Sequence, residues 1–411
     1  WYVNGSPSGS STQVAWNWDA GETDSATYRV VVVSDSGNKY RFRNSANSAT
    51  FAQSAVTLDL AEGGTYTFDG SDSTMASHPI KLSTTANGTH GGGSSYNTGV
   101  TYELDGSTVT ESAYVSGYSS ATSRKLIITV AASAPTLYYY CHVHSGMGGA
   151  INTNTTLGSS NFDGTIQTTV KANTTAGFSI VSYTGNGTNN ATIGHGLGVA
   201  PSARIGKARA LGSVGSAGPH WSVNHQNLNN GMNGGSSAGT VFLNLTQPQE
   251  NNNHGAVGAV SATTMTLSDG SSGSVPRAHV NENNATYIQY VFSEVAGYSK
   301  FGSYTGNANS DGPFVFTGFR PAFVIIRNPN NSGDYWLLLD NKRRTFNPNG
   351  ISSSLYANES LAEGTFGSGT GIDFLSNGFK IRDSNSRVNG SGNNIIYFAF
   401  AESPFKNSRA R

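Results

Sequence analysis

Charge is scarce in this sequence, and long apolar runs are missing. The 411 residues include 24 Lys and Arg and 24 Asp and Glu, so the net charge is zero and charged residues make up 12%, against ~25% in an average soluble domain. A nucleic-acid binder needs a basic excess to displace counterions from phosphates. No apolar run approaches the ~18 residues of a membrane span. We therefore expect neither a nucleic-acid partner nor insertion into a membrane.

Cysteine is also nearly absent. The single Cys141 excludes an intrachain disulfide. No paired carboxylates, phosphate loop or calcium loop stand in a setting that indicates catalysis. The run 235–239, Gly-Ser-Ser-Ala-Gly, matches a nucleophile elbow but lacks the strand before it and the helix after it. We therefore predict that the protein is not an enzyme.

Glycine and aromatic residues are plentiful, with 51 Gly, 19 Phe, 19 Tyr and 5 Trp. Most apolar segments are short, β-branched or aromatic, and bounded by turn residues, which predicts strands. No segment of about 12 residues has a helical period, so the sequence predicts an all-β protein with less than ~10% helix. The predicted strands are 28–33, 56–60, 65–68, 125–130, 137–141, 178–183, 241–245, 287–292, 322–326, 335–339 and 395–400.

An internal repeat occupies the second half of the chain. The run 176–186, Ala-Gly-Phe-Ser-Ile-Val-Ser-Tyr-Thr-Gly-Asn, returns with one extra residue at 296–307. Each copy continues with a proline before a strand, then a tryptophan, Trp221 or Trp336, and then a closing aromatic strand. A period of about 110–120 residues is too long for a solenoid. We therefore predict two tandem β-sandwich domains of the same topology.

The repeat divides the chain into five regions. The two sandwiches are assigned to 176–295 and 296–411, a different β domain to 27–150, and a linker to 151–175. Residues 1–26 are interpreted as a linker or as the end of a missing upstream region, because the chain opens at Trp1 without a signal peptide.

One set of residues has the types and the spacing of a metal-binding site. Cys141 ends a Tyr-rich strand, His144 and Met147 follow at intervals of three, and His78 stands beside an earlier strand. A blue-copper site needs a thiolate, two imidazoles and a weak thioether. The loop after the strand supplies three of these groups, and His78 supplies the fourth.

Here the domain resembles the cupredoxins of the plastocyanin and amicyanin type, over roughly 56–150. The resemblance implies a Greek-key sandwich that binds copper through His78, Cys141, His144 and Met147, with His142 at a non-ligand position. The alternative is a retained scaffold that has lost its metal. The triglycine beside His90 is interpreted as a loop.

The whole chain resembles proteins of marine bacteriophages that infect cyanobacteria and ocean heterotrophs. The resembling segments are 14–21, 30–42, 137–149, 176–185, 297–306 and 398–405. The resemblance implies an extracellular virion protein, a tail-fibre or appendage subunit. It would contact other virion proteins and a glycan or protein on the host surface.

Two other classes of function are compatible with the sequence. The same composition fits a bacterial or archaeal extracellular filament or surface-layer subunit, and a copper redox protein is the third interpretation. His220, Trp221 and His225 suggest either a sugar-stacking platform or a half-buried tryptophan with polar neighbours. Because thin β domains with edge strands favour self-assembly, we expect a homotrimer first and an open filament second.

Overall fold

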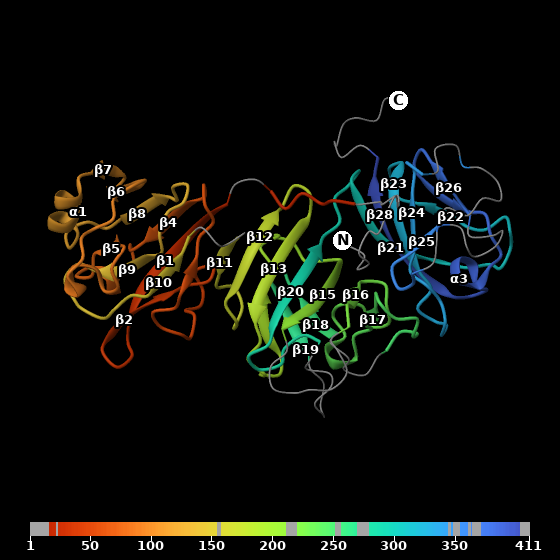
Figure 1. The fold of residues 1–411 in the computed structure, drawn as a ribbon, viewed down its shortest axis with the longest axis horizontal. Helices are drawn as coiled ribbons and strands as arrows, with labels where there is room; N and C mark the ends of the chain where they lie inside the picture. The colour runs from red at the N-terminus through yellow and green to blue at the C-terminus, as the bar shows by residue number, and fades with distance from the viewer. Residues whose placement is uncertain are drawn as a thin grey trace.

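The computed structural model describes residues 16–21, 24–153, 158–210, 220–250, 256–268, 279–343, 347, 354–360, 363 and 371–402. Three β units follow one another along the long axis of the molecule (Figure 1). The fold is all-β, as predicted, and the α-helices among the described residues are α1 (Glu111–Gly117) and α3 (Ser386–Asn389). No helix in these ranges has the length and apolar character that crossing a membrane requires.

The first unit is a sandwich of a six-stranded and a four-stranded sheet. The larger sheet has the order β2-β1-β4-β8-β6-β7, and the smaller has the order β3-β10-β9-β5. The strands are β1 (Ser25–Ser34), β2 (Asn38–Phe42), β3 (Leu58–Asp59), β4 (Thr65–Asp69), β5 (Ile80–Ser83), β6 (Val100–Leu104), β7 (Ser107–Val109), β8 (Arg124–Thr129), β9 (Leu137–Cys141) and β10 (Ala150–Asn152). Two 3-10 helices, η1 (Ser73–Met75) and η2 (Gly88–Gly91), lie in its connections.

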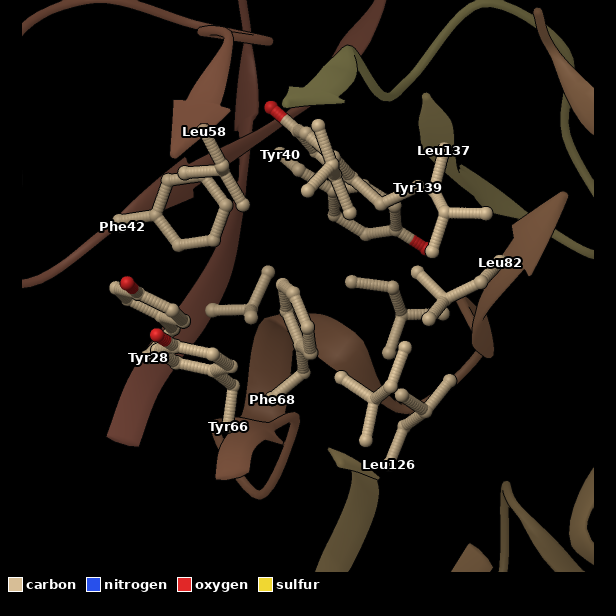
Figure 2. Close-up of a cluster of buried hydrophobic side chains, with 14 of the residues drawn as sticks. Tyr28, Tyr40, Phe42, Leu58, Tyr66, Phe68, Leu82, Leu126, Leu137 and Tyr139 are labelled. Atoms are coloured by element: carbon tan, nitrogen blue, oxygen red, sulfur yellow. The ribbon is translucent and has the colours of Figure 1, made fainter. Parts of the chain in front are cut away.

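The core of this unit combines aromatic and aliphatic side chains from both sheets. Figure 2 shows Tyr28, Tyr66 and Phe68 of the larger sheet facing Leu82 and other side chains of the smaller one. In β4 the buried residues alternate with less buried ones, so one face of the strand fills the core. Burying each such side chain contributes roughly 1.5–3 kcal/mol.

The second unit begins with the segment interpreted as a linker. Its large sheet has the order β11-β12-β13-β20-β15-β16-β17, and its small sheet has the order β14-β19-β18. The strands are β11 (Ser159–Asn161), β12 (Thr168–Asn173), β13 (Phe178–Thr184), β14 (Ala191–Gly194), β15 (Ala203–Ala210), β16 (Ser222–His225), β17 (Val241–Phe242), β18 (Ala256–Val260), β19 (Thr264–Ser268) and β20 (Thr286–Phe292). A 3-10 helix, η3 (Gly235–Ser237), precedes β17.

The third unit repeats this topology. Its sheets have the orders β21-β28-β23-β24-β25 and β22-β27-β26. The strands are β21 (Ser299–Thr305), β22 (Phe314–Phe316), β23 (Pro321–Arg327), β24 (Leu337–Asp340), β25 (Leu355–Tyr356), β26 (Ile372–Leu375), β27 (Gly378–Ile381) and β28 (Asn394–Ala401). Adding eight to each strand number of β13–β20 reproduces both orders, which confirms the predicted repeat.

The large sheets of the two repeats pack against each other. In β28, Ile395 and Tyr397 fill the core of their own unit, whereas Phe398 and Phe400 join a cluster shared with Phe178 and other residues of the second unit. Both faces of β28 are therefore buried, which explains its uninterrupted apolar sequence. The Trp336 Nε1–H donates to the carbonyl of Phe242 across the contact at 2.8 Å.

The structure corrects the interpretation of 151–175 and adds contacts for part of the 1–26 region. Residues 151–175 are not a linker, because β12 pairs along its length with β13 and β11 pairs with β12. Residues 16–20 pack on the repeats. The Trp16 ring stacks on the Phe323 ring with centroids 4.6 Å apart, and the Trp18 and Phe400 ring centroids are 5.3 Å apart. The rest of the predicted 1–26 region before Trp16 lies outside the described residues, as do 22–23.

Candidate metal centre

Two neighbouring strands bring His78 and Cys141 together. β5 pairs antiparallel with β9, and Ile80 lies opposite Cys141. His78 precedes Ile80 by two residues, where Pro79 leads from η1 into the strand, and the His142 N–H donates to the Pro79 carbonyl at 2.9 Å. The pairing therefore places a histidine 63 residues earlier in the chain beside the cysteine.

The loop after β9 carries His144 and Met147. Asn87 holds this loop, because its Oδ1 accepts from the Gly146 N–H and its Nδ2 donates to the Ser145 hydroxyl, both at 2.8 Å. The Tyr40 N–H donates to the Met147 carbonyl at 2.9 Å, and the Lys39 ammonium bonds the Gly146 carbonyl. The loop is thus held by Asn87 and by two consecutive residues of β2.

Three side-chain donors converge at this point. The Cys141 Sγ lies 3.9 Å from the His78 Nδ1 and 3.7 Å from the His144 Nδ1. One ligand atom from each residue lies within 4.8 Å of the others, and the two imidazole centroids are 4.6 Å apart. The His144 backbone N–H also donates to the sulfur at 3.4 Å. Met147 is buried at the end of the same loop, within the core of the unit.

Burial differs strongly among the donors. Cys141 is fully buried and His78 is 7% exposed, whereas His144 is exposed. Desolvation, followed by repulsion from His144, lowers the pKa of His78. A lowered pKa favours the neutral imidazole, which is the form that binds metals. The site therefore joins a buried thiol and a buried imidazole to a solvent-facing imidazole.

The donor set fits copper. Metal bonds of about 2.0–2.3 Å in a trigonal arrangement separate the donors by about 3.7 Å, close to the two observed sulfur–nitrogen distances. Thiolate and imidazole donors select Cu or Zn over Mg or Ca, and two imidazoles with one thiolate and a weak thioether are typical of blue copper. No carboxylate belongs to this group of donors.

The neighbouring histidines lie outside the group. His90 lies in η2, and its Nε2 is 3.1 Å from the Cys141 carbonyl oxygen. His142 has a buried Nδ1 without a hydrogen-bond partner, and burial lowers its pKa. Asn87, Lys39 and Tyr40 were missed by the sequence analysis. Asn87 has a positive φ of 61°, and an Asn-Gly pair such as 87–88 is typical of a turn, but this pattern does not indicate the contact with the loop that carries His144.

The other candidate site residues from the sequence lie in different environments. His225 is fully buried and its Nε2 lies 3.2 Å from the Tyr397 carbonyl oxygen in the contact between the repeats, so it cannot belong to a surface platform. Trp221 is half-buried, with the Lys207 ammonium 5.1 Å from its ring centroid. At 235–239 the 3-10 helix η3 is followed by extended backbone at Ala238. The nucleophile-elbow geometry is therefore absent from this described segment.

Comparison with known proteins assigns the second and third units. A family model described as "Domain of unknown function (DUF7483)" matches residues 152–404. The chain belongs to the DUF7483 family. No curated protein and no solved structure matches the chain.

The DUF7483 match coincides with the paired repeats. It begins at Asn152, the last residue of β10, and continues past β28. The family unit thus comprises both repeats, with the apolar cluster between them, and the match includes the β11–β12 segment. His78, Cys141 and His144 lie before the matched residues. The candidate metal centre therefore lies outside the residues that the DUF7483 model matches.

Proposed function

We propose that the first β unit is a cupredoxin-like domain that binds copper. The observation that carries this proposal is the convergence of the Cys141 sulfur with the Nδ1 atoms of His78 and His144. Cys141 would supply the thiolate, the histidines the two imidazoles, and Met147 the weak fourth ligand. A copper ion held there would supply one-electron redox chemistry.

The protein residues would control access and orientation. The core around Cys141 excludes water from the sulfur, since the residue is fully buried. The His144 N–H orients the sulfur, and Asn87 fixes the loop that carries His144. Exposed His144 and Val143, which is 53% exposed, place the solvent-facing side of the site where a redox partner has access.

The test is copper titration of the purified protein. We expect one copper per chain and an intense visible absorption from thiolate-to-copper charge transfer. Cys141→Ser should abolish that absorption, whereas His142→Gln, which changes a histidine outside the donor group, should retain it. Absence of the absorption in folded, copper-treated wild type would overturn the redox-site proposal. Tight zinc binding without it would instead indicate a zinc site.

For the whole chain, we propose a non-catalytic role as an extracellular virion subunit, in a tail fibre or similar appendage. The elongated arrangement of three β units (Figure 1) supports a projecting element. The doubly buried strands between the repeats support a rigid one. Together with the sequence resemblance, these features favour contact with other virion proteins and with a host glycan or protein.

Localisation separates this role from the main alternative. Antibodies against the protein should label purified phage particles in electron micrographs, and mass spectrometry should find the chain at a fixed ratio to the capsid protein. Labelling of a cell envelope or of cell-derived filaments, with none on particles, would indicate a filament or surface-layer subunit instead.

A further inference from the structure

The two repeats differ at one sheet edge. In the second unit, β14 is the edge strand of the small sheet, and a segment before β12 covers that edge. The Ile166 N–H donates to the Thr192 carbonyl at 3.0 Å, and the Thr165 and Thr192 hydroxyls each accept from the other residue's backbone N–H at 2.9 Å. In the third unit, β22 takes the place of β14. Within the described ranges no residue pairs with its outer edge.

The backbone of β22 offers hydrogen-bonding groups at this edge. The Thr317 N–H donates to the Asn377 carbonyl at 3.0 Å, and Val315 lies opposite Phe379 in the same ladder. Because hydrogen-bonding direction alternates along a strand, Val315 bonds toward β27. The N–H and C=O groups of Phe314 and Phe316 therefore point outward.

The side chains of β22 also alternate, between a buried face and an exposed face of the strand. Val315 is buried, whereas Phe314 is 45% exposed and Phe316 is 64% exposed. They occupy one face of an edge strand, next to Asp311, which is paired with Lys380 at 2.9 Å and Arg382 at 3.4 Å. Two aromatic rings on an open edge are the usual mark of an unprotected pairing site.

We propose that β22 pairs antiparallel with β22 of a second copy about a two-fold axis at Val315. Phe314 then lies opposite Phe316 of the partner subunit, and the outward backbone groups form hydrogen-bonded pairs. Directly opposite aromatic residues in such a pair are in contact. The two small sheets would join into one six-stranded sheet, β26-β27-β22 continued by its symmetry copy. This interface goes beyond the proposed functions.

A second copy fits this edge because the edge is complementary to itself. An antiparallel pair centred on Val315 matches Phe with Phe and donors with acceptors on both sides. The neighbouring charges are two acidic and two basic groups, Asp311, Asp373, Lys380 and Arg382, joined in ion pairs, so two copies do not repel. In the second unit the same edge is already covered by the chain itself.

The interface is small, so we expect the dimer to be weak. The exposed parts of the two rings amount to about 200 Å² per copy, below the ~800 Å² per partner of a standard stable interface. We therefore expect dimerisation at about 10–100 μM in solution. In an appendage that already holds copies side by side, the local concentration exceeds this range.

The register can be tested by cysteine cross-linking. Because Cys141 is fully buried, new surface cysteines will dominate the reaction. Cα atoms of a hydrogen-bonded pair lie about 5.5 Å apart, within the range for disulfides. An equal mixture of Phe314→Cys and Phe316→Cys protein should form a mixed disulfide dimer under mild oxidation. Each variant alone should cross-link at least ~10-fold more slowly, because residue 314 does not face itself.

Light scattering supplies the second measurement. Wild type should show a concentration-dependent dimer that Phe314→Ser/Phe316→Ser protein loses, with copper binding unchanged. A wild type that stays monomeric at ~100 μM, or single variants that cross-link as fast as the mixture, would overturn the proposal. Retention of monomeric wild type on a polysaccharide column, lost in the double serine variant, would also overturn it and assign the rings to sugar stacking.

Discussion

Asn186 and Asn281 bind each other reciprocally. The Asn186 N–H donates to the Asn281 Oδ1 at 2.9 Å, and the Asn281 Nδ2 donates to the Asn186 Oδ1 at 3.2 Å. Asn307 and Asn389 form the same pair in the third unit, at 2.7 and 2.9 Å. The asparagine that ends the repeated Tyr-Thr-Gly-Asn motif is therefore the exposed half of a clamp, and its partner, Asn281 or Asn389, is fully buried.

The rest of the motif has equally specific roles. The Tyr183 and Tyr304 hydroxyls each donate, at 2.6 Å, to the carbonyl of the residue before the clamp partner, Val280 or Val388. At Gly306, a Cβ would lie 2.2 Å from the Gly390 carbonyl oxygen, so the backbone approaches too closely for a side chain. The motif recurs because each repeat closes its sandwich with the same tyrosine, glycine and asparagine.

Removing this clamp should destabilise the third unit. The fully buried Asn389 donates to the Asn309 and Asp383 carbonyls as well as to Asn307. Asn389→Ala leaves these acceptors unpaired, which should cost about 2–4 kcal/mol of unfolding free energy. Urea unfolding measures it, with the exposed Asn330→Ala as control. Equal losses in the two variants would contradict the clamp.

Acid should weaken the contact between the repeats. Full burial lowers the pKa of His225 to about 4, below the ~6.5 of an unfolded chain. The unfolded state therefore binds more protons between these values. Stability should be complete above pH ~6.5 and fall by up to roughly 3 kcal/mol as the pH drops toward ~4.

A His225→Gln variant isolates this effect. Unfolding free energies measured by urea at several pH values should fall less steeply for the variant. His195, whose pKa burial also lowers, stays in both proteins and cancels. Parallel pH profiles for wild type and variant would show that His225 does not titrate in this way.

The amino-terminal tryptophans should hold the repeats together. Trp18 is half-buried and its ring lies within 6.3 Å of Phe178, Phe292 and Phe400, which belong to both repeats. Because Trp→Ala at a fully buried site costs 3–5 kcal/mol, Trp18→Ala should cost about 2 kcal/mol. Thermal unfolding compares it with the exposed neighbour variant Asn17→Ala, which should behave as wild type. A change of less than ~0.5 kcal/mol would mean that this segment only rests on the surface.

Local pattern predicted most strands but not their partners. The β-branched and aromatic runs marked β9, β20 and β28 because each buries at least one face. β12, with the polar sequence Thr-Thr-Val-Lys-Ala-Asn, was misread as linker because its order depends on pairing with β13. Trp16 and Trp18 pack against Phe323 and Phe400, which lie more than 300 positions away in the chain, and no local sequence pattern indicates such a contact.

The candidate metal centre was likewise predictable only in part. The intervals from Cys141 to His144 and Met147 are local, so the sequence predicts the loop directly. The place of His78 follows from the β5–β9 register, which sequence spacing alone does not determine. The anchor Asn87 lies 58 residues from Ser145, and its role emerges only when the two loops are seen together.

Replacing Asn87 should weaken copper binding. Asn87 fixes the metal loop through Ser145 and Gly146, so Asn87→Ala removes both bonds and also strains a backbone with φ of 61°. Loss of such an orienting contact should weaken copper affinity ~10–100-fold, measured by competition with a chelator of known affinity. Asn87→Asp keeps the oxygen that accepts from the Gly146 N–H, so its affinity should lie between those of wild type and the alanine variant. If Asn87→Ala protein, folded by circular dichroism, bound copper as tightly as wild type, the loop would not depend on this anchor.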